Sequence, residues 1–188
     1  MRYLIFDFDG TLAWLRVDWG AVRASIEEIY GPLRGKPLFT WLRERVLRGL
    51  DISRALEIIR EAELEAVEAL DFDEEIVALL RLLRGRGLRM ALISMQDDEV
   101  LRRALEVMGA EGIFDFVVGR RTELLREEQI RRVLKGWGIE PGQAIFISDR
   151  AEDVELGLRM GLRAMRLFYL DGSLKRWLRE FLDEAINV

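Results

Sequence analysis

An apolar run near the N-terminus ends in two aspartates, and it restricts the possible folds more than any other stretch of the chain. Residues 3–6 read Tyr-Leu-Ile-Phe and predict a buried strand, which Asp-Phe-Asp-Gly-Thr follows at residues 7–11. Acidic groups at the carboxyl end of a buried parallel strand lie in the crevice where open α/β sheets bind ligands. Because strand side chains alternate, Asp7 and Asp9 are expected on the same side, where they could share a cation or divide the roles of nucleophile and proton donor. An Asp-Gly turn after the strand is the simpler alternative.

The rest of the chain predicts alternating strands and helices. Further strands are expected at residues 88–93, 114–118, 144–147 and 164–168, and helices at 74–84, 97–108, 127–137 and 152–160. This alternation indicates an α/β fold, a doubly wound parallel sheet with right-handed crossovers. Residues 14–70 show only helical spacing and predict a small all-helical insertion after the first strand. The expected domains are an α/β core, residues 1–13 and 72–188, and a helical domain, residues 14–71.

The composition excludes several classes of chemistry. The 188 residues include no cysteine and no histidine, so disulfides, zinc–thiolate sites, cysteine nucleophiles and Ser-His-Asp triads are all excluded. The net charge of -5 argues against a nucleic-acid surface, and no apolar run is long enough for a membrane span or forms a leader. We therefore expect a soluble, cytoplasmic protein. The charged fraction of 34% suggests a thermophilic source.

Polar side chains follow two more of the predicted strands. Ser94 comes directly after residues 88–93, and Asp149 and Asp153 follow the strand at 144–147, one helical turn apart. Taken alone, Ser94 is typical of a turn, and the two aspartates could cap a helix. At the end of a parallel strand, however, a hydroxyl and the next backbone N–H, that of Met95, could hold a phosphate oxygen.

Residues 7–11, followed in order by Ser94, Asp149 and Asp153, resemble the motifs of the haloacid dehalogenase superfamily, whose members are mostly Mg²⁺-dependent phosphohydrolases. The resemblance covers residues 1–12 and about 74–168, and it implies a Rossmann-like core. It also implies that Asp7 is the nucleophile and that Asp9 is the general acid and base. The implied Mg²⁺ site consists of Asp7, Asp9 through its backbone carbonyl, Asp149 and Asp153, and the implied phosphate site includes Thr11, Ser94 and Met95.

One residue of the family pattern is missing. Members normally carry a lysine at the start of the helix before the fourth-motif strand, but none of the three lysines of this chain lies near that position. Arg126 is the best substitute and is expected in the phosphate site, with Arg120 and Arg121 as further candidates. An arginine can clamp phosphate oxygens in pairs, although its planar fork is not a compact point charge. The alternative for Arg126 is a solvated residue on a charged helix start.

The helical insertion lies between the first and second motifs, which is the position of the superfamily's first class of cap domain. Such caps cover the site and help to choose substrates, so Arg16 and Arg43 are candidates for substrate contact. Residues 34–48 carry five bases and one acid, whereas residues 61–75 carry eight acids and no base. The basic segment could face the cleft and receive an anionic substrate, or the two segments could be solvated surfaces that attract each other.

These observations predict a Mg²⁺-dependent phosphatase that hydrolyses a small phosphate monoester through an aspartyl-phosphate intermediate. The expected partner is a small phosphorylated metabolite, with no nucleic acid and no membrane. A phosphomutase of the same family and a catalytically weak binding protein are alternatives, whereas a dehalogenase is disfavoured because dehalogenases lack the second aspartate. Apolar residues at helical spacing near the C-terminus predict a helix that packs on the core or forms a dimer contact, so we expect a monomer or a homodimer.

Overall fold

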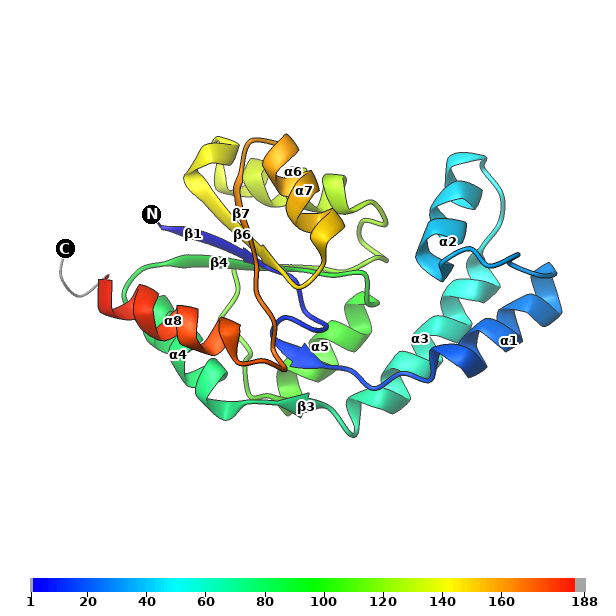
Figure 1. Cartoon of the computed structure of the whole chain (residues 1–188), viewed down its shortest axis with the longest axis horizontal. Coiled ribbons are helices and arrows are strands. Elements are labelled where there is room, and N and C mark those ends of the chain that lie inside the picture. The colour runs from blue at the N-terminus through cyan, green and yellow to red at the C-terminus, as the bar shows by residue number, and fades with distance from the viewer. Residues whose placement is uncertain (1, 185–188) are drawn as a thin grey trace.

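The computed structural model describes residues 2–184 and contains a five-stranded parallel sheet at its centre (Figure 1). The strands are β1 (Tyr3–Phe6), β4 (Arg89–Ile93), β5 (Phe116–Val118), β6 (Ala144–Ser148) and β7 (Arg163–Arg166). Their order across the sheet is β5-β4-β1-β6-β7, and β1 pairs in parallel with both β4 and β6. The doubly wound parallel sheet predicted from the sequence is therefore confirmed, with strand ends that differ from the prediction by one or two residues.

Helices cover both faces of this sheet. The helices on one face are α4 (Glu74–Gly85), α5 (Asp98–Val107) and α8 (Ser173–Glu184), and those on the other are α6 (Arg126–Trp137) and α7 (Ala151–Arg159). Successive residues of β1 serve the two faces, because Leu4 and Phe6 pack with the first set of helices and Ile5 with the second. A strand buried on both faces is apolar throughout, which explains the continuous run that the sequence shows.

The C-terminal helix α8 packs on the core, which was the first of the two alternatives for its apolar face. Leu174, Leu178 and Leu182 are buried in the same hydrophobic cluster as the inner face of α4.

No helix within residues 2–184 has the length and apolar character needed to cross a membrane.

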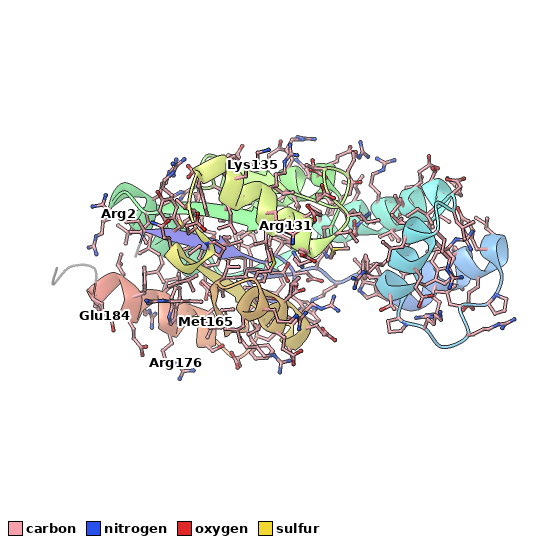
Figure 2. All side chains as sticks on the ribbon, turned by 90° about the horizontal axis from the view of Figure 1, so that it is seen from above. Arg2, Arg131, Lys135, Met165, Arg176 and Glu184 are labelled. Carbon is pink, nitrogen blue, oxygen red and sulfur yellow. The ribbon has the colours of Figure 1, made fainter. Side chains whose placement is uncertain are left out.

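The helices α1 (Trp19–Tyr30), α2 (Leu38–Leu47) and α3 (Ser53–Val67) form a hydrophobic cluster of their own. Figures 1 and 2 show these helices extending from one end of the sheet. Asp18 caps α1 by accepting a hydrogen bond from the backbone N–H of Ala21, and Asp51 accepts one from Ser53 at the start of α3. We call residues 14–71 the helical segment.

Two short strands that the sequence did not predict lie at the two ends of the helical segment. Ala13–Trp14 (β2) and Asp71–Phe72 (β3) pair in an antiparallel ribbon where the chain enters and leaves the helical segment. A strand of two residues has no periodicity that a sequence pattern could reveal. The two strands pair because the connections into and out of the helical segment run side by side.

A 3₁₀ turn, Pro141–Gln143, precedes β6.

Candidate active site

The carboxyl ends of β1, β4 and β6 bring the predicted site residues to one edge of the sheet. Asp7 directly follows β1, and its backbone N–H donates to the carbonyl oxygen of Ile147 on β6, 2.9 Å away. Ser94 directly follows β4, and Asp149 directly follows β6. Because parallel strands all end at the same edge, residues more than 140 positions apart in the sequence meet here.

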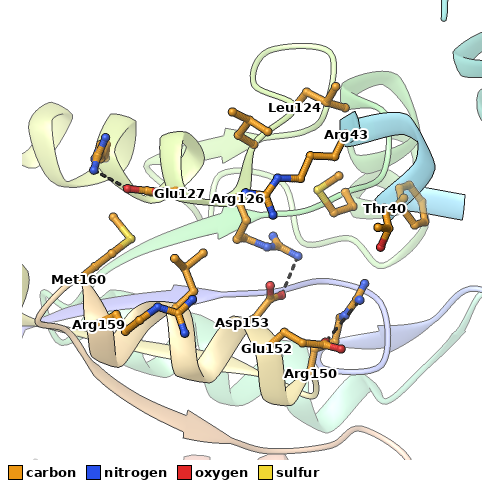
Figure 3. A pocket seen from close by; sticks show the side chains of 15 residues that line it. Thr40, Arg43, Leu124, Arg126, Glu127, Arg150, Glu152, Asp153, Arg159 and Met160 are labelled. Carbon is orange, nitrogen blue, oxygen red and sulfur yellow. Dashed lines mark hydrogen bonds and ion pairs between the residues drawn. The ribbon is translucent and has the colours of Figure 1, made fainter. Parts of the chain in front are cut away.

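Arg126 makes an ion pair with the predicted nucleophile. Its Nη2 atom lies 2.9 Å from Asp7 Oδ1 and 3.0 Å from Asp153 Oδ2, and Figure 3 shows the second of these contacts. The side chains of Arg126 and Asp7 are 8% and 4% exposed, so the guanidinium is not the solvated group of the alternative interpretation. One nitrogen makes both contacts, as an ammonium group could. Arg120 and Arg121, the other two candidates, pair with different acids.

Two residues that the sequence analysis did not single out support this arrangement. Gln129 accepts a hydrogen bond from Arg126 Nη1 at 3.0 Å and donates to the carbonyl oxygen of Ser94 at 2.7 Å. The hydroxyl of Ser148 donates to Asp153 Oδ2 at 3.3 Å. Both could have been suspected, because Gln129 lies one helical turn after Arg126 and Ser148 immediately precedes Asp149 at the strand end.

Burial raises the pKa values of both aspartates of the first motif. The pKa of Asp7 rises from 3.8 to about 6, with the charge of Arg126 opposing the rise and the charges of Asp153 and Asp149 adding to it. The pKa of Asp9 rises to about 7, although a hydrogen bond from the Leu15 N–H opposes the effect of burial. Near neutral pH, Asp7 is therefore mostly ionised while much of Asp9 is protonated. A carboxyl group that stays partly protonated near neutral pH, such as Asp9, can act as a proton donor.

The backbone of residues 8–12 also forms a turn, so the structural and the functional interpretations of the Asp-Gly sequence coexist. Within it, Asp9 Oδ1 accepts the N–H of Leu15 at 2.8 Å. Thr11 is fully buried, and its hydroxyl accepts the backbone N–H of Asp149 at 2.9 Å. This bond holds Asp149 against the first motif and leaves the O–H of Thr11 as a donor, so the phosphate contact of Thr11 stays a prediction.

The predicted cluster of carboxylates around one cation is not formed by side chains alone. Over residues 2–184, no three His, Cys, Asp or Glu side chains form a group that could hold a metal ion. The reason is that the carboxylate of Asp9 is turned toward Leu15, while that of Asp153 is paired with Arg126. The carboxylate of Asp153, which was predicted among the metal ligands, therefore pairs with Arg126 instead. Asp9 was expected to bind through its backbone carbonyl, and that expectation stays a prediction.

A smaller set of oxygen atoms does fit a hard cation. Asp149 Oδ1 is buried without a hydrogen-bond partner, and burial raises the pKa of this carboxyl group. Gly10 leaves open the space beside it, since a Cβ atom there would lie 2.5 Å from Asp149 Oδ2. The carboxylates of Asp7 and Asp149, with the backbone carbonyl of Asp9, supply the all-oxygen donors that Mg²⁺ prefers.

Ser94 is fully buried and takes part in a local network of hydrogen bonds. Its hydroxyl donates to the side-chain oxygen of Gln96, whose backbone N–H is 3.3 Å from Ser94 Oγ. The carbonyl oxygen of Ser94 accepts the bond from Gln129. A rotation about one side-chain bond would free the hydroxyl for an incoming oxygen.

A cavity of about 570 Å³ opens between α2 of the helical segment and the helices α6 and α7 of the core (Figure 3). Four predicted site residues line it, namely Arg43, Met95, Arg126 and Asp153. Arg16, the other candidate for substrate contact, does not. Its guanidinium lies 2.9 Å from Asp71 Oδ2 beside the β2–β3 ribbon, so Arg16 joins the two connections to the helical segment.

The two charged segments of the helical region do not pair with each other within residues 2–184. Glu63 and Glu68 of the acidic segment pair with arginines of the core, while Lys36 and Glu44 pair inside the basic segment. Arg43 forms no ion pair with the residues that the structure describes, and its guanidinium reaches the cavity wall (Figure 3). At this position the basic segment faces the cavity.

The parallel sheet and the helical segment together are similar in fold to known structures. A protein described as a predicted phosphatase from Clostridium acetobutylicum superposes with a TM-score of 0.68 at 22% identity, covering 100% of this chain and 99% of that one. L-2-haloacid dehalogenase from Xanthobacter autotrophicus superposes with a TM-score of 0.61 at 20% identity, covering 89% and 77%. At these identities the similarity defines the class of fold.

The sequence defines the family more closely. Residues 22–167 match the model of the haloacid dehalogenase-like hydrolases, so the chain belongs to this family and is an enzyme. Phosphoglycolate phosphatase from Aquifex aeolicus is 28% identical over 87% of this chain and 83% of its own length. Phosphoglycolate phosphatase 1 from Pseudomonas aeruginosa is also 28% identical, over 89% and 70%. These relatives support a phosphatase.

Proposed function

We propose that this chain is a Mg²⁺-dependent phosphatase that hydrolyses a small phosphate monoester through a phosphorylated Asp7. The observation that carries the proposal is the buried contact between Asp7 and Arg126 at the end of β1, beside a second acid, Asp9, with a pKa of about 7. This arrangement supplies an ionised nucleophile, a fixed positive charge and a proton donor at the carboxyl end of β1.

In the first step, a carboxylate oxygen of Asp7 attacks phosphorus, and the bond from phosphorus to the ester oxygen breaks. Protonated Asp9 gives its proton to the departing alkoxide, so that an alcohol leaves. In the second step, Asp9 removes a proton from a water molecule that attacks the phosphorus of the aspartyl phosphate. Inorganic phosphate leaves, and Asp9 is protonated again, ready for the next cycle.

The phosphoryl oxygens would be held by Ser94, Met95 and Arg126. The Ser94 hydroxyl and the Met95 backbone N–H lie at the end of β4, and Arg126 reaches the site from the first turn of α6. Because a single nitrogen of Arg126 contacts both Asp7 and Asp153, we propose that it performs the task of the missing lysine.

The Mg²⁺ ion would be held by the carboxylates of Asp7 and Asp149 and the backbone carbonyl of Asp9. When bound, it supplies the positive charge that offsets repulsion between the Asp7 carboxylate and the phosphate dianion. Thr11 serves this site indirectly, because its hydroxyl fixes the backbone of Asp149.

The helical segment would act as a cap that selects the leaving group. Arg43 on α2 presents a guanidinium to the cavity above Arg126 (Figure 3). A substrate with a second negative group, such as a carboxylate, would satisfy this charge. Phosphoglycolate is the first ester to test, since similar proteins from Aquifex and Pseudomonas carry that name. The cytoplasmic location, thermophilic source and oligomeric state stay predictions from the sequence.

The experiment is hydrolysis of p-nitrophenyl phosphate and phosphoglycolate with Mg²⁺ or with EDTA. Asp7→Asn should abolish turnover of both esters, whereas the matched control Asp171→Asn, an exposed aspartate on the loop before α8, should leave it unchanged. Arg43→Gln should reduce kcat/KM for phosphoglycolate by about tenfold or more, with a smaller effect on p-nitrophenyl phosphate. Retained activity in Asp7→Asn would refute the covalent mechanism.

Binding of the ion can be measured apart from turnover. Mg²⁺ at millimolar concentration should raise the melting temperature of the wild-type protein, because an ion that binds only the folded state stabilises it. The same addition should have little effect on Asp149→Asn. An equal shift in both proteins would place the ion elsewhere.

A further inference from the structure

A buried ion pair joins the helical segment to the core next to the active site. Glu63 lies near the end of α3, and Arg120 lies on the loop that follows β5. Arg120 Nη1 is 2.7 Å from Glu63 Oε1 and 2.8 Å from Glu63 Oε2, and the two side chains are 1% and 0% exposed. The two residues are 57 positions apart. Among residues 2–184, neither forms a hydrogen bond with Asp7 or Asp9.

The two residues of this pair also form hydrogen bonds with the backbone of the loop after β4. Arg120 Nη1 donates to the carbonyl oxygen of Met95 at 2.8 Å, and the backbone N–H of Arg120 donates to the carbonyl oxygen of Gln96 at 2.9 Å. Glu63 Oε2 accepts the backbone N–H of Asp97 at 3.3 Å. All three residues that follow Ser94 are therefore bonded to the pair.

Stability alone is a poor explanation for this pair. Burial raises the pKa of Glu63, and the Nε and Nη2 atoms of Arg120 are buried without a hydrogen-bond partner. Desolvation of two charges can exceed their attraction, and apolar side chains in place of a buried pair often leave a protein equally stable. What apolar side chains could not reproduce is the set of directed bonds to residues 95–97.

We propose that Glu63 and Arg120 are positioning residues that fix the loop of residues 94–97 for phosphate binding. By fixing the carbonyl groups of Met95 and Gln96 and the N–H of Asp97, the pair sets the path of the loop. The loop in turn sets the positions of the Met95 N–H and the Ser94 side chain, which would bind the phosphoryl oxygens. Because Glu63 belongs to the helical segment, that segment then shapes the phosphate site as well as covering it. The inference rests on the proposed function, in which Ser94 and Met95 bind phosphate.

The test compares Glu63→Gln with Glu99→Gln, which breaks the ion pair between Arg60 of α3 and Glu99 of α5 without touching the loop. Glu63→Gln should lower kcat/KM by about 10- to 100-fold, because small displacements of binding groups have effects of this size. KM and the inhibition constant of inorganic phosphate should rise. Glu99→Gln should change each of these by less than about twofold.

The inhibition constant separates positioning from stability. A variant that merely unfolds in part has fewer active molecules, so its apparent kcat falls while KM and the inhibition constant stay unchanged. The double variant Glu63→Met/Arg120→Met should melt near the wild-type temperature and still bind phosphate about tenfold more weakly.

Wild-type phosphate affinity in the folded double variant would overturn the inference and leave the proposed function standing. Failure of both variants to fold would assign the pair to stability and also overturn it. A wild-type protein that hydrolyses no ester would instead overturn the proposed function, and this inference with it.

Discussion

The strongest test of the site's electrostatics is the effect of Asp7→Asn on stability. Burial raises the pKa of Asp7 from 3.8 to about 6 even though Arg126 is 2.9 Å away. The ionised carboxylate is therefore less stable in the folded protein than in the unfolded chain. The asparagine side chain has nearly the same shape and no charge, so this variant should be inactive and yet more stable than the wild type at neutral pH.

The size of the gain follows from the pKa shift. A rise from 3.8 to about 6 corresponds to about 3 kcal/mol at 1.36 kcal/mol per unit. For a chain of 188 residues this free energy raises the melting temperature by about 6–12 °C. The wild-type protein takes up a proton on folding between pH 3.8 and about 6, so its stability falls as pH rises through this window. The advantage of the variant should be complete above pH 6 and absent below pH 4.

The assay is urea unfolding of Asp7→Asn and wild type between pH 4 and 8, in EDTA so that no cation compensates the carboxylate charge. Asp171→Asn removes an exposed carboxylate and should show no gain at any pH. A variant less stable than the wild type at pH 8 would mean that the pair with Arg126 outweighs the cost of burial. A gain that does not change with pH would mean that packing, not charge, is responsible.

Three further predictions concern the same site. The value of kcat/KM should fall about tenfold per unit as pH rises above about 7, because Asp9 of the free enzyme must be protonated to act as the acid. A flat profile of kcat/KM from pH 6 to 9 would exclude Asp9 as that acid. Gly10→Ala should reduce activity and stability more than Gly172→Ala, because both glycines have positive φ but only at residue 10 would a Cβ meet the Asp149 carboxylate. Equal losses of activity and melting temperature in the two variants would show that contact with Asp149 is not responsible. Arg126→Lys should keep kcat within about tenfold of the wild type while Arg126→Met loses about 100-fold or more, and an active methionine variant would remove Arg126 from the mechanism.

The sequence by itself determined the sheet and the residues at its edge. Apolar runs separated by helical patterns predict parallel strands, and parallel strands end at one edge whatever the details of packing. For this reason Asp7, Ser94 and Asp149 could be assigned to one site before any coordinates were known. The single helical turn between Asp149 and Asp153 could likewise be read from the local sequence, and so could the absence of a lysine at the start of α6.

Only the tertiary structure decided which partners these residues have. Arg126 and not Arg120 contacts Asp7, because the path of residues 119–125 turns one guanidinium toward β1 and the other toward α3. The bond between Glu63 and Arg120 joins segments with no common sequence pattern, and the β2–β3 ribbon is too short to have one. Local patterns fix which elements form and where they end, whereas the direction of a buried charge depends on every element packed around it.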